Sequence, residues 1–235
     1  MSQASEDDDL QDLPWPKPCA PSSEVSQAIR QQCTKGLCHK RGASAGQRLM
    51  AALGISAFTT GLVCWMATTS ARPEGAVASG LYGIVGWGIV LTAILALSLG
   101  RPPGRRGSVA LRVALATLVP LAFFAYLAFA ASGRVPFDTF SHGAHAHHAV
   151  LCGLVSLVIG AIVAGGVMLC FRRTDPLTPG LSGAIVGLAG GLTSAVAIGV
   201  ACPSSEAWHL WAAHGLALVA LVLLGWGVGR RVLSP

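Results

Sequence analysis

The sequence predicts an all-α fold: a polytopic membrane protein with a six-helix transmembrane bundle and a largely disordered N-terminal cytoplasmic tail. Hydrophobic residues make up 53% of the 235 residues and charged residues only 11%. A typical soluble domain has about 25% charged residues. The apolar residues also form long continuous runs. Strands of a membrane β-barrel would instead alternate apolar and polar residues, so the runs indicate membrane-spanning helices.

Six apolar segments are long enough to cross a bilayer as helices. Each has roughly 22 residues, which at 1.5 Å per residue matches a hydrocarbon core of about 30 Å. The interiors of the segments contain no Asp, Glu or Lys, and Arg112 in the first turn of the third is expected to extend toward the membrane surface. The predicted spans are about 49–71, 76–99, 109–131, 149–171, 178–201 and 207–229.

The distribution of basic residues predicts that both termini are cytoplasmic. Twelve Lys and Arg residues lie near the span ends on the side of the termini, and only Arg72 and Arg134 lie on the other side. Basic residues are enriched on the cytoplasmic side of membrane proteins. The net charge of +6 is therefore read as a sign of topology and of contact with anionic membrane lipid. It does not indicate direct nucleic-acid binding.

Composition divides the chain into two parts. Residues 1–46 form a polar tail that begins with an acidic cluster, and residues 47–235 form the six-span transmembrane domain. Within the tail, Ser22 or Ser23 is expected to cap a short helix that contacts lipid or a partner protein. The spacing of three tail cysteines lacks the CxxC pattern of common zinc sites, so their role stays open. These cysteines are Cys19, Cys33 and Cys38.

Two cysteines are predicted to lie at the same depth on the outer side. Cys152 is near the start of the fourth span and Cys202 is at the end of the fifth, so each lies within a turn of the outer surface. If these antiparallel spans pack together, the two thiols come within reach of a disulfide, which persists in the periplasm. The alternative is that both are small buried hydrophobic residues, as free cysteines commonly are.

Six histidines also lie on the predicted outer face. Imidazole and thiolate together bind zinc, copper or nickel, but a loop rich in His and Gly is equally a solvated linker. His214, about two turns into a span, is expected to need a polar partner. His209 and His214 are five residues apart, so they are not expected to share a helix face as i, i+4 ligands do. The six are His142, His145, His147, His148, His209 and His214.

Glycines recur on one face of the fifth span. Gly183, Gly187 and Gly191 are spaced at i, i+4 and i+8. Small residues at this spacing let membrane helices approach closely. The favoured interpretation is packing within one bundle, and homo-oligomerisation is the alternative.

Enzymatic and transport functions receive little support. Ser182 and His214 resemble the dyad of rhomboid proteases, but the predicted topology separates them by roughly 15 Å in depth. A nucleophile and its base must approach to about 3 Å. Ion-coupled transporters usually keep an ionisable residue inside the bilayer, whereas every acidic residue here lies in the tail or a loop. We therefore expect no enzyme and no resident cofactor, apart from a transient metal ion held by Cys and His.

The stretch from Asp175 to His214, DPLTPGLSGAIVGLAGGLTSAVAIGVACPSSEAWHLWAAH, resembles the C-terminal signature of NrsF-type anti-sigma factors. In that family a Pro-containing turn precedes a Gly/Ala-rich fifth span, which ends in Cys-Pro before an aromatic-rich entry to the sixth. A second family cysteine lies at the outer start of the fourth span, where this sequence has Cys152. The resemblance extends over about 149–230 and is weaker in the first three spans and the tail.

The resemblance implies a bacterial inner-membrane protein that restrains an extracytoplasmic-function sigma factor. Under this hypothesis the tail, residues 1–46, binds the sigma factor. A redox or metal signal at Cys152 and Cys202 then shifts the packing of spans four to six and releases it. The alternative from another functional class is a metal or small-solute transporter or accessory protein that uses the His-rich outer loop.

Overall fold

A computed structural model of the chain describes residues 22–28, 31, 43–68, 76–101, 107–132, 144–175, 177–202 and 207–234. The chain divides into two compact units, Met1–Gly42 and Ala43–Pro235. In the first unit, residues 23–28 are helical. The amide of Val25 donates to Ser22 Oγ at 3.4 Å, which confirms Ser22 as the cap of the predicted tail helix. The predicted disorder of the tail, and all three of its cysteines, lie outside the described residues.

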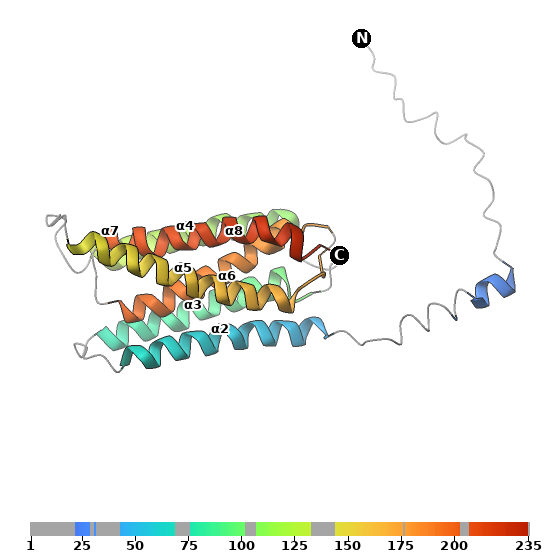
Figure 1. The fold of residues 1–235 in the computed structure, drawn as a ribbon, viewed down its shortest axis with the longest axis horizontal. Coiled ribbons are helices and arrows are strands. Elements are labelled where there is room, and N and C mark those ends of the chain that lie inside the picture. Colours follow the sequence, from blue (N-terminus) through green and yellow to red (C-terminus); the bar gives the residue numbers. More distant parts are fainter. Residues whose placement is uncertain are drawn as a thin grey trace, which may run out of the picture. The chain divides into compact units, whose positions relative to one another are not determined.

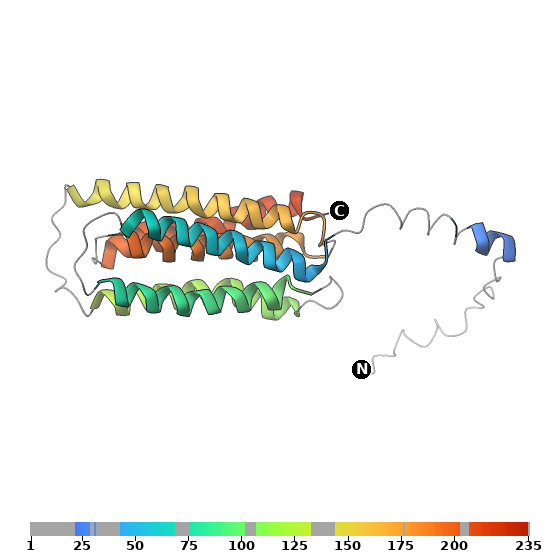
Figure 2. The same ribbon diagram turned by 90° about the horizontal axis from the view of Figure 1, so that it is seen from below.

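The second unit is all-helical in its described residues, as the sequence predicts. Its helices run side by side along one direction in both views (Figures 1 and 2). The last of them is continuous in the chain but changes type, from α7 through a π-helical segment to α8. The elements are α2 (Ala45–Thr68), α3 (Ala76–Ser98), α4 (Val109–Ser132), α5 (Ala144–Cys170), α6 (Pro179–Ala201), α7 (Ala207–His209), the π-helical segment (Leu210–Gly215) and α8 (Leu216–Val232).

Five helices among the described residues are long and apolar enough to cross a membrane, whereas the sequence predicts six. The difference concerns α3, because its described apolar stretch is Gly83–Ser98. That stretch is shorter than the roughly 20 residues a bilayer requires, but it is only the part of α3 whose side chains are described, and the whole helix Ala76–Ser98 has 23 residues. The helix itself is present at the predicted position, so the prediction holds for the helix and not for the span count.

Capping residues and a proline define where three of the helices begin. Ser44 and Gln47 form a reciprocal capping box at the start of α2, in which Ser44 N donates to Gln47 Oε1 at 2.8 Å and Gln47 N donates to Ser44 Oγ at 3.2 Å. Ser108 Oγ accepts from the amide of Leu111 at 3.2 Å at the start of α4. Pro179 occupies the first turn of α6, where its missing N–H costs no hydrogen bond.

The most buried helix is α6. In an 18-residue window of its apolar stretch Pro179–Gly199, 89% of the residues are buried, against 44% or fewer in the corresponding windows of the other four spans. It contacts α2, α3, α4, α5 and α8. Figure 1 shows α6 between α8 on one side and α2 and α3 on the other, and Figure 2 shows it between α5 and the pair α3 and α4. The outer helices carry exposed large apolar side chains such as Phe58, Trp65 and Ile162, as a lipid-facing surface does.

Glycines bring the backbones of α6 and α8 together. A Cβ at Gly183 would overlap the carbonyl oxygen of Gly225, and one at Gly187 would overlap that of Leu221. A Cβ at Gly191 would overlap the side chain of Leu218. The glycine face of α6 is thus occupied by α8 of the same chain.

This packing predicts different effects for two Gly-to-Ala changes on the same helix. Gly187→Ala is expected to lower the free energy of unfolding by about 1–3 kcal/mol, because the methyl group meets backbone that cannot yield easily. Gly199→Ala is the matched control, since no atom lies within 4 Å of its added Cβ. It is expected to be neutral or stabilising by up to about 1 kcal/mol through helix propensity. Thermal unfolding of the detergent-solubilised protein measures both, and equal unfolding temperatures would contradict the packing described.

Candidate functional site

Cys152, Cys202 and His209 come together at the end of the bundle where α6 terminates. One sulfur or ring nitrogen from each residue lies within 4.8 Å of those of the other two. Cys202 Sγ lies 3.2 Å from His209 Nε2. His209 is buried, and both cysteines are half-buried. We call these three residues the Cys202 cluster, and this end of the bundle the Cys202 end.

Each member of the Cys202 cluster is held by a different element. Cys152 lies on α5, and His209 is the last residue of α7. Cys202 is the C-cap of α6, where its amide donates to Ile198 O at 2.6 Å and its backbone turns extended at φ −74° and ψ 125°. Pro203 follows in the sequence, and a residue before proline is driven out of helical conformation. The Cys-Pro pair therefore ends α6 at the point where the thiol meets α5 and α7.

The π-helical segment brings His214 close to His209. A π-helix closes i to i+5 hydrogen bonds, so residues five apart can lie near each other. The two imidazole rings have centroids 5.9 Å apart. The expectation that His209 and His214 lie on separate faces was wrong, because it assumed an ordinary α-helix. Such π-helical insertions are often found at functional sites.

His214 has the polar partner that its depth requires. Its Nδ1 lies 3.2 Å from Ser156 Oγ of α5, and both side chains are buried, with exposed fractions of 1% for His214 and 0% for Ser156. Ser156 follows Cys152 by one helical turn, so α5 presents a thiol and a hydroxyl on one face. Sequence reasoning did not single out Ser156, although a serine four residues after a candidate cysteine is a usable signal.

The other predicted histidines are less informative. His142 lies outside the described residues, and for His145 and His148 the structure describes the backbone of α5 but not the side chain. His147 is exposed. Of the six histidines, the structure therefore brings His209 into the Cys202 cluster and His214 next to it.

The Cys202 cluster has donors suited to two kinds of chemistry. Two sulfurs and one imidazole nitrogen form a donor set that fits a soft or borderline cation such as copper or zinc. The same two sulfurs are also near enough for a disulfide after a small movement, because the S–S bond is about 2.0 Å long. The geometry alone accommodates either one.

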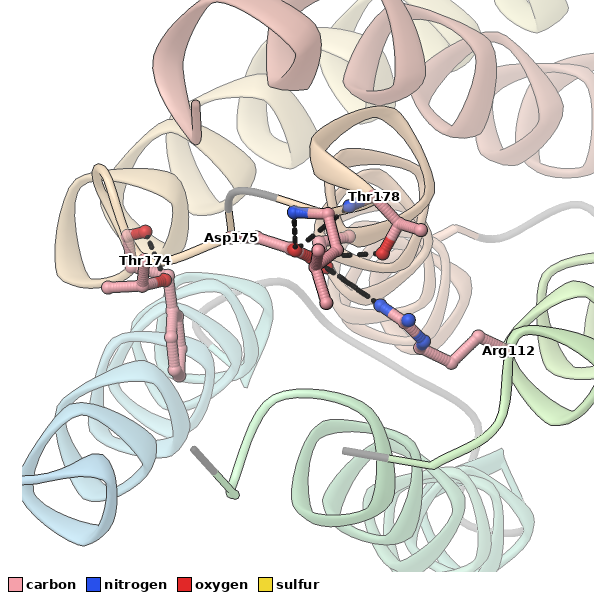
Figure 3. Close-up of polar contacts among 7 residues, drawn as sticks. Arg112, Thr174, Asp175 and Thr178 are labelled. Carbon is pink, nitrogen blue, oxygen red and sulfur yellow. Dashed lines mark hydrogen bonds and ion pairs between the residues drawn. The ribbon is translucent and has the colours of Figure 1, made fainter. Parts of the chain in front are cut away.

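A second polar cluster lies at the opposite end of α6 (Figure 3). Asp175, in the turn before α6, accepts hydrogen bonds from the amides of Leu177 and Thr178 at 3.1 and 3.0 Å and from the hydroxyl of Thr178 at 3.3 Å. It also accepts from Ser182 Oγ and pairs with Arg112 Nη1 of α4 at 3.5 Å. We call Arg112, Asp175, Thr178 and Ser182 the Asp175 cluster, and this end of the bundle the Asp175 end.

Sequence reasoning missed the Asp175 cluster. Arg112 was expected to extend toward the membrane surface, but it is 5% exposed and turns inward. The reason is its partner, because Asp175 is 2% exposed and lies 63 residues away in the sequence. The arginine also donates to Ser182 Oγ at 3.2 Å. Ser182 and His214, which resemble a protease dyad in sequence, thus belong to separate networks with separate partners.

The geometry of the Cys202 cluster predicts where an oxidant forms a disulfide. Treatment of the full-length protein with diamide is expected to link Cys152 to Cys202 within one chain, and peptide mapping under non-reducing conditions identifies the linked pair. Cys64 and Cys170, which the structure keeps outside the cluster, serve as internal controls. A disulfide that joins Cys152 or Cys202 to another chain, or one that links Cys152 to a control cysteine, would contradict the site.

Comparison with known proteins supplies the family. No curated protein and no solved structure matches the chain. Residues 39–234 match the family described as Negative regulator of sigma F (NrsF). The match covers all described helices of the second unit and includes both clusters, while most of the tail lies before it. The chain belongs to the NrsF family of negative regulators of a sigma factor.

Proposed function

We propose that this chain is a membrane-bound anti-sigma factor. It holds an extracytoplasmic-function sigma factor at the bacterial inner membrane and releases it when a signal reaches the Cys202 end. The observation that carries the proposal is the family match over residues 39–234, because that family regulates a sigma factor negatively. The apolar surface of the bundle supports the membrane part of the proposal, and the proximity of Cys152 to Cys202 supports the sensor part.

In this proposal the bundle crosses the membrane six times, with α3 as the additional span. The Asp175 end faces the cytoplasm, because Arg48, Arg172, Arg173, Arg230 and Arg231 all belong to segments at that end. The Cys202 end then faces the periplasm. There the Cys202 cluster is accessible to oxidants and metal ions from outside, which a redox or metal signal requires.

The tail, residues 1–46, is the proposed contact with the sigma factor. It begins with Glu6, Asp7, Asp8 and Asp9, and an acidic segment of this kind complements a basic surface of a partner protein. Most of the tail precedes the family match at residue 39. A segment outside the shared bundle is suited to recognise a particular sigma factor.

The proposed signal acts on the Cys202 cluster in one of two ways. In the redox case the two thiols lose two protons and two electrons to an external disulfide, which is reduced to two thiols. In the metal case the two thiols lose their protons to water, and the resulting thiolates bind a soft cation together with the neutral imidazole of His209. The disulfide draws α5 and α6 together at one point, and the metal ion also draws in α7.

The transporter alternative depended on the His-rich segment before α5. His147 is the one histidine of that segment whose side chain is described, and it is exposed. No described observation favours transport over sigma-factor regulation.

The proposed role of the tail predicts its binding behaviour. A fusion of residues 1–46 is expected to capture one of the host's extracytoplasmic-function sigma factors, and deletion of residues 1–42 from the full chain is expected to raise transcription from that sigma factor's promoters. A second fusion, in which the four acidic residues at positions 6–9 are changed to Asn or Gln, tests the acidic contact and should bind the sigma factor more weakly. If the tail captures no sigma factor and its deletion leaves transcription unchanged, the anti-sigma function is wrong.

The proposed sensor predicts a loss of response when its thiols are removed. The double variant Cys152→Ser, Cys202→Ser is expected to retain the sigma factor in the presence of diamide or Zn²⁺. A reporter under a promoter of that sigma factor is then expected to stay silent with either probe. Cys64→Ser, Cys170→Ser is the control, because neither thiol belongs to the Cys202 cluster. A double variant at 152 and 202 that responds fully to both probes would remove these cysteines from the mechanism.

A further inference from the structure

We propose that the Asp175 cluster is a latch that holds the sigma-retaining state, and that α6 couples it to the Cys202 cluster at its other end. This inference rests on the proposed function and specifies how the signal reaches the cytoplasmic side. It assigns a regulatory role to Arg112, Asp175 and Ser182.

The latch joins three parts of the bundle at one point. Arg112 comes from α4 (Figure 3), and Ser182 belongs to the first turn of α6. Asp175 belongs to the turn that connects α5 with α6, and its own amide donates to Leu233 O at the end of α8 at 3.1 Å. The neighbouring amide of Arg173 donates to Val232 O at 3.3 Å. A change in the position of α6 at this end therefore disturbs contacts with α4, α5 and α8 together.

The composition of the latch suits a switch better than a static support. Removing two charges from water costs free energy that a buried ion pair recovers only with short contacts and full hydrogen bonding. Here the Arg112–Asp175 contact is 3.5 Å long, and Arg112 Nε has no hydrogen-bond partner in the described residues. The arginine side of the pair is thus incompletely satisfied, whereas Asp175 accepts four further hydrogen bonds. The best-attested role of a buried ion pair that adds little stability is to select one arrangement of the fold over another.

The helix α6 is the element that reaches both clusters. It starts next to Asp175 and ends at Cys202. The side chains around it are closely packed, and its glycine face lies on the backbone of α8. Closely packed helices respond to a perturbation by small sliding movements as rigid bodies, not by bending. Tightening at the Cys202 cluster therefore displaces the start of α6 and weakens the contacts of Asp175 and Ser182 with Arg112.

Coupling of this kind works in both directions. If oxidation at Cys202 favours the open latch by a certain factor, then opening the latch raises the equilibrium constant for oxidation by the same factor. Breaking Asp175 contacts must then shift the redox equilibrium of a thiol pair at the opposite end of the helix. A residue that merely supports the local fold has no such effect on a folded protein.

The first test measures that equilibrium in the purified full-length protein, without any sigma factor. The protein is equilibrated in glutathione buffers, in which formation of the Cys152–Cys202 disulfide converts one glutathione disulfide to two glutathiones. Asp175→Asn and Arg112→Gln are expected to shift the glutathione ratio at half-oxidation toward easier oxidation by about fivefold or more. Arg172→Gln, which removes an exposed charge at the same end, is the matched control and should not shift it.

Ser182→Ala keeps the test available if the charge variants fail to fold. It removes the hydroxyl that contacts both Arg112 and Asp175 without changing a charge, and it should shift the midpoint in the same direction by a smaller factor. Unchanged midpoints in the folded variants would overturn the latch. This outcome is independent of the anti-sigma function, because no sigma factor takes part.

The second test places Asp175→Asn in the signal-blind double variant Cys152→Ser, Cys202→Ser and follows a sigma-dependent reporter. The latch acts downstream of the thiols, so the triple variant is expected to raise the uninduced reporter by about fivefold or more, with normal amounts of protein in the membrane fraction. A reporter that stays silent would overturn the latch. If deletion of the whole protein also leaves the reporter silent, the anti-sigma function fails instead.

Discussion

The close approach of α6 to α8 determines where the polar groups of this bundle can lie. Glycines at positions 183 and 187 of α6 and at 225 and 229 of α8 leave no room for a Cβ between the two backbones. The helix α6 is therefore held in the middle of the bundle, in contact with five neighbouring helices. Its two ends are where polar side chains can meet, and each end has a cluster. Cys202 meets Cys152 and His209 at one end, and Asp175 and Ser182 meet Arg112 at the other.

Much of the fold could be predicted from the sequence, because long apolar runs have few alternatives to helices. The helices α4 and α6 begin and end within one residue of the predicted spans. The helices α2 and α5 begin earlier, since α2 starts at the Ser44 cap and α5 continues through the polar stretch before Cys152. The length of an apolar run predicts which residues lie within the membrane, but capping and polar residues decide where the helix itself begins or ends.

The candidate site could be predicted only in part. The shared depth of Cys152 and Cys202 follows from counting spans, and the structure brings the two residues together. The approach of His209 to His214 depends on a π-helical segment that the residue spacing does not reveal. The ion pair of Arg112 with Asp175 joins two segments 63 residues apart, and without knowledge of how α4 packs on α6 neither residue identifies the other. Contacts that depend on helix type or tertiary packing are the ones sequence reasoning misses.

In the proposed mechanism the redox state of the Cys152–Cys202 pair sets the affinity of the chain for a sigma factor. The most direct measurement is the dissociation constant of the captured sigma factor for the full chain in lipid nanodiscs, determined with the pair reduced and with the pair oxidised. Oxidation is expected to weaken binding by about fivefold or more, and the Cys152→Ser, Cys202→Ser variant is expected to bind equally under both conditions. Equal dissociation constants for the reduced and oxidised protein would contradict this mechanism.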